Sequence, residues 1–247
     1  MIKKRLLIDG DILAYKAATL AEVDTKWEDG LWTLHADENY AKSLLHNEIE
    51  TLKENLETSS IIIALTDSKN FRKDVLPSYK DNRKQRRKPL VLGALREHLR
   101  KQYKAIVVPT LEADDVIGIL ATKPTDEQRI ICSLDKDFKQ IPSYLSQDGK
   151  TVVLRKKKEC DWWHLIQTLT GDSTDGYYGC PSVGIVTAKK ILKNRRQSVN
   201  KMWDLVVDTY KKNGLTKEDA LQQAQVARIL RHGDYNKQTG EVNLWKV

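Results

Sequence analysis

The stretch LLIDGD at residues 6–11 is a short apolar run that ends in two aspartates, and two later stretches repeat this arrangement. IIIALTD at 61–67 ends in one aspartate, and IICSLDKD at 130–137 ends in two. Apolar runs of this length predict buried β-strands. If these strands lie parallel in one sheet, their carboxyl ends share the edge at which open α/β sheets place their binding sites.

Segments with helical periodicity alternate with the apolar runs, which predicts an α/β fold with a mostly parallel central sheet flanked by helices. After about residue 161 helical patterns dominate, and the last of them, 216–231, opens with the capping sequence TKED. The chain of 247 residues is therefore expected to form three parts. These are an α/β core over 1–170, a helical subdomain over 171–232 and a tail hairpin over 233–247.

Two smaller features concern the ends of the sheet and of the chain. An Asp29-Gly30 pair between Trp27 and the apolar residues 31–34 predicts a β-hairpin, which we expect to extend the edge of the sheet. Trp245 lies in the carboxyl tail, where we expect it to cover the core rather than to stack on a nucleic-acid base.

Further carboxylates are expected at the same sheet edge, from EADD at 112–115 and GDSTD at 171–175. Each segment alone has an ordinary explanation as a turn, a helix cap or a complement to a helix dipole. Together they gather like charges, and two carboxylates about 4 Å apart repel by roughly 4 kcal/mol at an effective dielectric near 20. The sequence therefore predicts a site for hard divalent cations, Mg²⁺ or Mn²⁺. The candidate ligands are Asp9, Asp67, Glu112, Asp114, Asp115, Asp135, Asp137, Asp172 and Asp175.

Composition points to a polyanionic partner. The net charge is +8 and the pI about 9.2 despite the clustered acids, so positive charge elsewhere outweighs them and favours nucleic acid. The three cysteines contain no CxxC pair, which argues against a zinc site and a disulfide framework. The sequence shows neither a signal peptide nor an apolar run of about 18 residues, so we expect a soluble, cytoplasmic protein that does not bind a membrane.

Two segments are candidates for holding nucleic acid. YKDNRKQRRK at 79–88 has six cations in the nine residues from Lys80 to Lys88, and it lies between two predicted core elements rather than in a tail. A charge run is usually a solvated face, but cations beside a metal cluster also suit a phosphodiester on which negative charge develops. Tyr79 could stack on a base. The cations carried forward are Lys80, Arg83, Lys84, Arg86 and Arg87.

GCPSVGIVTAKKILK at 179–193 is the second such segment, a Gly/Pro turn that leads into a helix. The first amides of that helix could bind a phosphate of a duplex backbone, with Lys189 and Lys190 close by. An ordinary packing corner between two helices explains the same residues equally well. Ser182 and Gly184 are the turn residues in question.

The order of these motifs resembles that of the structure-specific 5′-nucleases, which include phage and bacterial flap endonucleases and 5′→3′ exonucleases and are relatives of PIN-domain ribonucleases. The matching order is IDGD, Asp67, YKxxR, EADD, DKD, GDxxD and the Gly/Pro turn, over about residues 8–192. The resemblance implies a PIN-like fold with two divalent ions. Asp9, Asp67, Glu112 and Asp114 would surround one ion, the last four aspartates of the candidate set would lie toward the second, and Asp115 would assist.

The resemblance also assigns roles in holding the substrate. Lys80 and Arg83 match the cations that act on the scissile phosphate, and Tyr15 matches an aromatic residue that stacks on the terminal nucleotide. The Gly/Pro turn is similar to a helix–three-turn–helix element that holds duplex backbone and often K⁺. Ser182 stands where relatives commonly have glycine, and the segment from Tyr79 to Glu112 is shorter than in many relatives that thread a strand beneath a helical arch.

The expected function is therefore divalent-metal-dependent hydrolysis of phosphodiester bonds in DNA, as a 5′→3′ exonuclease or a 5′-flap endonuclease. The substrates would be DNA with 5′ ends, flaps or nicks, with RNA–DNA hybrids left open, and the enzyme would be a monomer in bacterial or phage-infected cytoplasm. Three alternatives remain. A non-catalytic DNA-binding module gives the acids no purpose, an aspartyl-phosphate phosphatase has no use for the basic stretch, and PIN-type ribonucleases usually lack a segment like 171–231.

Overall fold

The centre of the molecule is a six-stranded sheet with the strand order β5-β4-β1-β6-β7-β8. The computed structural model describes residues 3–195 and 197–247. The strands are β1 (Lys4–Asp9), β4 (Ile61–Leu65), β5 (Ile106–Val107), β6 (Gln128–Cys132), β7 (Tyr144–Ser146) and β8 (Val153–Leu154). All neighbouring pairs are parallel except β7 with β8. This confirms the mostly parallel sheet, and β7 is a short strand that the apolar pattern did not indicate.

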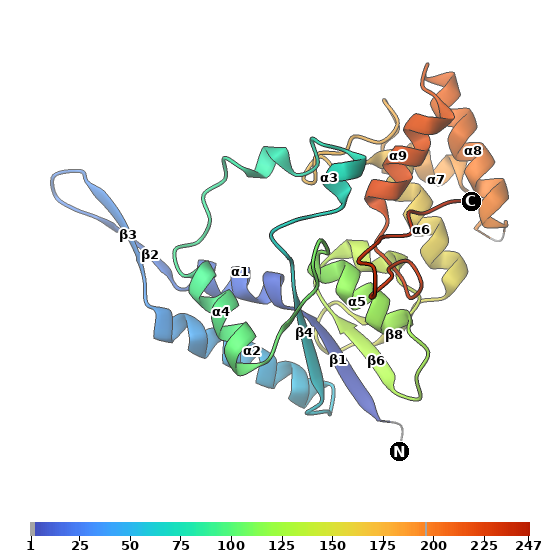
Figure 1. Ribbon diagram of the computed structural model, residues 1–247. Helices are drawn as coiled ribbons and strands as arrows, with labels where there is room; N and C mark the ends of the chain where they lie inside the picture. Colours follow the sequence, from blue (N-terminus) through green and yellow to red (C-terminus); the bar gives the residue numbers. More distant parts are fainter. Residues whose placement is uncertain (1–2, 196) are drawn as a thin grey trace.

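Helices cover both faces of the sheet, as Figure 1 shows. The helices α1 (Gly10–Leu20), α2 (Glu38–Asn55) and α4 (Leu92–Gln102) pack on one face, and α5 (Ala113–Thr122) packs on the other. Strand β1 is buried on both sides: Leu6 and Ile8 join the cluster with α1, α2 and α4, whereas Leu7 joins the cluster with α5. This is why residues 6–8 of β1 are apolar without alternation.

Gly10 explains how α1 can begin directly after β1. A Cβ atom at this position would lie 2.7 Å from Cγ2 of Ile63 and 2.8 Å from the carbonyl oxygen of Ala64. No side chain fits in that space, so the glycine between Asp9 and Asp11 allows the first turn of α1 to lie against the end of β4. The two aspartates are thereby held at the centre of the sheet edge, beside the ends of β4 and β6.

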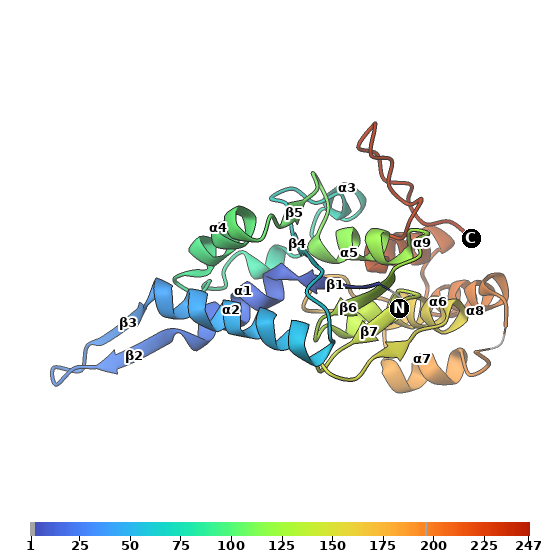
Figure 2. The same cartoon turned by 90° about the horizontal axis from the view of Figure 1, so that it is seen from below.

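The hairpin around Asp29-Gly30 forms as predicted, from β2 (Glu22–Lys26) and β3 (Trp32–Ala36). The expectation that it extends the central sheet is wrong, because the two strands form a sheet of their own. They project from the body beyond α1 and α2 (Figures 1 and 2). Their sequence has no uninterrupted apolar run with which to pair in a buried sheet, and most of their residues are exposed.

The helical part contains α6 (Lys157–Thr170), α7 (Ile185–Ile191), α8 (Val199–Lys212) and α9 (Lys217–Ala227), which share one apolar cluster. Thr216 and Asp219 form the predicted capping box of α9. The prediction that this helix continues to residue 231 is wrong. After Ala227 the chain is extended, because the amide of Ile229 donates to the side chain of Gln140 and the amide of Leu230 donates to the Asp115 carboxylate. Since α6 packs with α7–α9, the boundary at residue 170 stays a prediction.

The carboxyl tail returns to the body. An antiparallel bridge joins Tyr235 to Val242. The ring centroid of Trp245 lies 5.0 Å from that of His164 and 5.1 Å from that of Trp203, which confirms that Trp245 covers the core. Three short elements complete the fold: α3 (Arg72–Val75), η1 (Asp81–Arg83) and η2 (Lys136–Gln140). Over residues 3–195 and 197–247, no helix has both the length and the apolar character needed to cross a membrane.

Candidate metal centre and nucleic-acid interface

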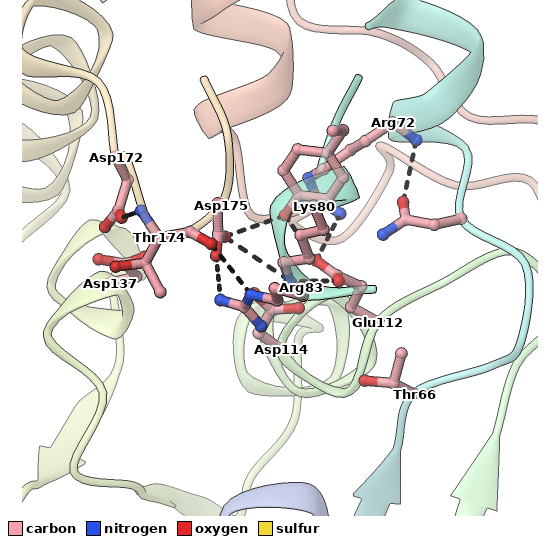
Figure 3. Close-up of polar contacts among 12 residues, drawn as sticks. Thr66, Arg72, Lys80, Arg83, Glu112, Asp114, Asp137, Asp172, Thr174 and Asp175 are labelled. Atoms are coloured by element: carbon pink, nitrogen blue, oxygen red, sulfur yellow. Dashed lines mark hydrogen bonds and ion pairs between the residues drawn. The ribbon is translucent and has the colours of Figure 1, made fainter. Parts of the chain in front are cut away.

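A cavity of about 420 Å³ lies at the carboxyl ends of β1, β4 and β6. Seven of the nine predicted metal ligands line it, together with Asp11, Lys80 and Arg83. The seven acids are Asp9, Glu112, Asp114, Asp135, Asp137, Asp172 and Asp175. Figure 3 shows how acids and cations from separate parts of the chain point toward one another. We call this cavity the metal pocket.

Local backbone hydrogen bonds hold the acids at the starts of helices. Asp9 caps α1 and accepts hydrogen bonds from the amides of Asp11 and Ile12, both at 3.1 Å. Asp135 caps η2 in the same way and accepts from the amide of Asp137 at 2.8 Å. Glu112 occupies the cap position of α5. The positive ends of the helix dipoles therefore stabilise carboxylates in the pocket.

The pocket raises the pKa of several carboxyl groups. Burial, assisted by the charge of Asp135, raises the pKa of Asp9 to about 7, and burial together with Asp135 does the same for Asp137. Burial and the charges of Asp115 and Glu112 raise the pKa of Asp114 well above its ordinary value. Such groups hold protons until a positive charge replaces them. An all-oxygen donor set of this kind fits a hard divalent cation.

We expect divalent-ion binding to strengthen with pH. Protons compete with the ion at Asp9 and Asp137, so the affinity for Mn²⁺ should rise about ten- to hundredfold from pH 6 to pH 8. Without divalent ions, Asp9 and Asp137 bind more protons in the folded state than in the unfolded chain. This difference holds at pH values between the ordinary carboxyl pKa and about 7. The free energy of unfolding should therefore fall as pH rises through this range. Titration of free Mn²⁺ by electron paramagnetic resonance tests the first expectation, and an affinity independent of pH would contradict it.

Two cations contact Glu112 inside the pocket. Although burial opposes ionisation, Lys80 and Arg72 lower the pKa of Glu112 below its ordinary value. The Lys80 amine forms an ion pair with Glu112 and lies 3.6 Å from Asp175. Burial lowers the pKa of Lys80, but Glu112 and Asp175 outweigh this effect and raise it. Lys80 therefore stays charged inside the metal pocket.

The backbone at Lys80 is fixed by the segment that carries Asp175. Lys80 adopts a left-handed conformation with φ of 57°, which is costly for a residue with a side chain. Its amide donates to the carbonyl oxygen of Asp175 at 2.8 Å. The Arg83 guanidinium pairs with the Asp175 carboxylate and donates to the carbonyl oxygen of Thr174 at 3.0 Å. The predicted cation pair thus lies in the pocket together with the acids that it faces (Figure 3).

The structure does not bring Asp67 to the metal pocket. Its carboxylate accepts a hydrogen bond at 2.9 Å from the amide of Thr110, and its neighbour Thr66 lines the pocket instead. Asp115 lies within 4.8 Å of Glu112 and Asp114, but it is fully buried and both its oxygens accept from Arg72, at 2.7 and 2.8 Å. Both residues are thus engaged in structural contacts, and their roles as metal ligands stay predictions.

The structure contradicts the prediction that Tyr79 could stack on a base. Its side chain is 2 % exposed, so neither face of the ring is open to a stacking base. Its hydroxyl donates to Glu112 at 3.0 Å and contacts Asp175 at 3.1 Å. The aromatic ring is buried because the chain turns inward between α3 and η1. Tyr79 therefore supports two pocket acids rather than offering a stacking surface.

Two arginines in the site were not predicted from the sequence. Arg72 binds Asp115 and lies 3.4 Å from Glu112, and Arg96 from α4 contacts Asp11 and donates to the carbonyl oxygen of Thr66. Neither belongs to a charge run or a motif. The one available signal for Arg96 is its place beside the apolar stripe of α4 that contains Leu95 and Leu99.

Apart from Tyr79, the predicted nucleic-acid contacts are exposed. Lys84, Arg86 and Arg87 lie on the segment that crosses from η1 to α4. Both ends of that segment are anchored, since Arg83 binds Asp175 and Arg87 donates two hydrogen bonds to Glu22, at 2.6 and 2.7 Å. On α1 the Tyr15 side chain is 52 % exposed and remains available for stacking. In the turn and in α7, the four predicted contacts Ser182, Gly184, Lys189 and Lys190 are all exposed.

Ser182 has a left-handed backbone conformation, with φ of 61°. A glycine adopts this conformation without steric cost, which accounts physically for the glycine expected at this turn. We expect Ser182→Gly to raise the free energy of unfolding by about 1 kcal/mol. Thermal unfolding measures the change, and Ser173→Gly, at an exposed turn position without a positive φ, is the matched control. Equal effects of the two substitutions would contradict the expectation.

Comparisons with known proteins agree on one family. Residues 4–167 match the family model described as the 5′-3′ exonuclease, N-terminal resolvase-like domain. The chain is 35% identical to an exodeoxyribonuclease of Enterobacteria phage T3, covering 97% of this chain and 92% of the relative. It is 36% identical to an exonuclease of Escherichia phage T7, covering 98% and 93%. It is also 33% identical to the flap endonuclease Xni of Shewanella oneidensis, over 53% of this chain and 55% of that protein.

Solved structures show the same fold. A flap endonuclease of bacteriophage T5, crystallised as a pseudo-enzyme-product complex with DNA and metal ions, superposes with a TM-score of 0.66. The superposition covers 91% of this chain and 89% of the T5 chain, at 14% identity. A second structure of the T5 protein, co-crystallised with metal ions, gives a TM-score of 0.62 over the same shares. At 14% identity this likeness shows the fold alone, which is a PIN-like arrangement of sheet and helices.

Proposed function

Since the chain belongs to the 5′-3′ exonuclease family defined by that resolvase-like domain, we propose that it hydrolyses DNA from 5′ ends, nicks or flaps with the help of two divalent ions. It is a phosphodiester hydrolase, as are its relatives named exodeoxyribonuclease, exonuclease and flap endonuclease. The observation that carries the proposal is the single cavity in which seven predicted acids meet Lys80 and Arg83.

We assign the acids of the metal pocket to two groups, one for each ion. Asp9, Glu112 and Asp114 would hold one ion, and a second would be held by Asp135, Asp137, Asp172 and Asp175. Bound there, two divalent ions supply the acidity that activates a water molecule and the positive charge that stabilises an in-line displacement at phosphorus. Mg²⁺ and Mn²⁺ both suit these oxygen ligands.

The side chains of the chain itself hold the substrate. Lys80 and Arg83 are positioned to bind the scissile phosphate, where positive charge favours the transition state. The exposed turn at Ser182 and Gly184, with Lys189 and Lys190 on α7, would contact the backbone of a duplex and could hold K⁺. We further propose that the enzyme acts as a monomer in the cytoplasm and that RNA–DNA hybrids are a second substrate class.

The test is a product ladder from one 5′-flap substrate labelled in turn at each end, with Mg²⁺ and with chelator. Mononucleotides released from the 5′ end mean exonuclease action, and a released flap means endonuclease action. Cleavage must disappear with chelator and return with Mg²⁺. A protein that binds the substrate in Mg²⁺ but leaves it intact would instead be a non-catalytic DNA-binding module.

Lys80→Ala separates substrate chemistry from metal binding. Loss of the amine should lower the single-turnover cleavage rate about a hundredfold, because one charge-assisted contact in the transition state is missing. Mn²⁺ affinity should change little, since the acids remain. Lys101→Ala is the matched control, as this lysine is exposed on α4 outside the pocket. An unchanged rate in Lys80→Ala would remove Lys80 from the catalytic residues.

A further inference from the structure

A second cavity of about 200 Å³ adjoins the metal pocket. It lies between α1, the last turns of α2 and the loop after β7, and it shares Asp9, Ile12 and Leu134 with the metal pocket. We call it the side cavity. The Leu134 side chain on the border is 65 % exposed and follows directly before Asp135 in the chain.

The two cavities have a defined order along the crevice. Asp172 and Asp175 line the metal pocket but not the side cavity, and they belong to the segment that leads from α6 into the turn before α7. Asp9 and Leu134 border both cavities. The side cavity therefore lies beyond the metal pocket when the crevice is entered from the proposed duplex-holding turn.

The lining of the side cavity suits a nucleotide. Its floor is apolar, formed by the buried side chains of Leu13, Leu52 and Cys132, and offers a surface for a base. The rim carries the amines of Lys16 and Lys150 and the side-chain amide of Asn55, together with the carboxylates of Glu48 and Asp148. Asp148 accepts hydrogen bonds from the backbone amides of Lys150 and Thr151. Within the part of the chain that the structure describes, the Lys150 amine and the Asn55 amide have no partner, whereas Lys16 pairs with Glu48. An apolar floor with a few free polar groups at the rim is typical of small-ligand sites.

We propose that the side cavity holds the 5′-terminal nucleotide of the strand being degraded and then the nucleoside 5′-monophosphate that is released. The inference rests on the proposed function and names the product of the same site. In hydrolysis, water adds to phosphorus, the 3′ oxygen of the terminal nucleotide leaves with a proton, and the shortened strand keeps the phosphate at its new 5′ end. The cavity is smaller than the usual range of ligand pockets, roughly 300–1,000 Å³, so it favours one nucleotide over an oligonucleotide.

Binding of dTMP in the presence of chelator tests the side cavity without catalysis. Thr51→Trp places a large ring in the cavity from an exposed position on α2, and should weaken dTMP binding by about tenfold or more. Glu54→Trp puts the same ring on the same helix outside the cavity lining, and should bind dTMP like the unaltered protein. Isothermal titration calorimetry gives the three affinities, and far-UV circular dichroism confirms that each variant is folded.

Lys150→Glu provides a second variant at an exposed turn position. Reversing this charge should weaken the binding of dTMP far more than the binding of thymidine, because only the nucleotide carries a phosphate for the rim. Absence of dTMP binding by the unaltered protein, or equal binding in all variants, would overturn the inference. The proposed function is judged separately, by Mg²⁺-dependent cleavage of a 5′-labelled duplex. Cleavage without dTMP binding would refute the role of the side cavity and leave the proposed function intact. Binding of dTMP without cleavage would refute the proposed function.

Discussion

The double variant Asp135→Asn, Asp137→Asn is expected to lose cleavage activity by about a thousandfold or more, while still binding a branched duplex. Both carboxylates line the metal pocket, and they are proposed to hold one of the two divalent ions. Removing an ion that stabilises the transition state by several kcal/mol accounts for the loss, because each 1.36 kcal/mol is a factor of about ten in rate. Single-turnover cleavage in Mg²⁺ measures the effect.

A matched control separates the lost ion from the lost charge. Asp204 and Asp208 are exposed on α8, and Asp204→Asn with Asp208→Asn removes two negative charges away from the metal pocket. This control should cleave normally. Both double variants should bind duplex DNA slightly more tightly than the unaltered protein, because each is less negative. Undiminished turnover by the Asp135 and Asp137 variant would refute their role as metal ligands.

Arg72→Met is expected to lower the free energy of unfolding by about 3–5 kcal/mol, the usual cost of breaking a buried ion pair from one side. Arg72 is 2 % exposed and donates two hydrogen bonds to the fully buried Asp115. It also donates to the carbonyl oxygens of Val226 and Arg228, at 2.9 and 2.6 Å. One side chain thus joins α3, the start of α5 and the end of α9. Its loss leaves the Asp115 carboxylate buried without a cation, held only by the backbone amides of Glu112 and Leu230 among the described residues.

Urea unfolding monitored by circular dichroism measures this loss. Lys73→Met is the matched control, since the side chain of this neighbouring lysine is 43% exposed and pairs with Asp81. It should change the free energy of unfolding by less than about 1 kcal/mol. The Mn²⁺ affinity of the folded Arg72→Met variant tests the role of Asp115. If Asp115 positions Glu112 and does not itself bind an ion, the affinity should fall only modestly. Equal stability of the two variants would show that the Arg72 contacts are not needed.

The sequence predicted those parts of the fold and site that depend on local pattern. The buried part of a parallel strand must be apolar, so an acid soon after an apolar run indicates where the strand ends. Asp9 is the last residue of β1, and Asp135 follows the end of β6 by three residues. The motif order placed Glu112, Asp172 and the Lys80 and Arg83 pair in the same cavity. Asp9, Glu112 and Asp135 occupy helix N-caps, whose positions follow from the residue types around them.

The remaining features depend on contacts between distant segments. Arg72 and Arg96 are single cations without a motif, and only the packed structure shows that they face Asp115 and Asp11. Tyr79 opens a highly charged run and would be expected at the surface. Its hydroxyl instead donates to Glu112 and contacts Asp175, which are 33 and 96 residues away in the sequence. Asp67 continues an apolar run as Asp9 does, yet its carboxylate caps the turn at Thr110.

The positions of the tryptophans give the molecule two separate optical reporters. Trp27 and Trp32 lie on the projecting hairpin and are 54 % and 59 % exposed, so a collisional quencher such as iodide should reach them freely. The other four of the six lie in α6, α8 and the tail, at Trp162, Trp163, Trp203 and Trp245. None is in the sheet or in the helices that cover it. Tryptophan fluorescence therefore reports on the hairpin and the helical part. The α/β core contributes no tryptophan signal, so a fluorescent label attached there can be observed separately.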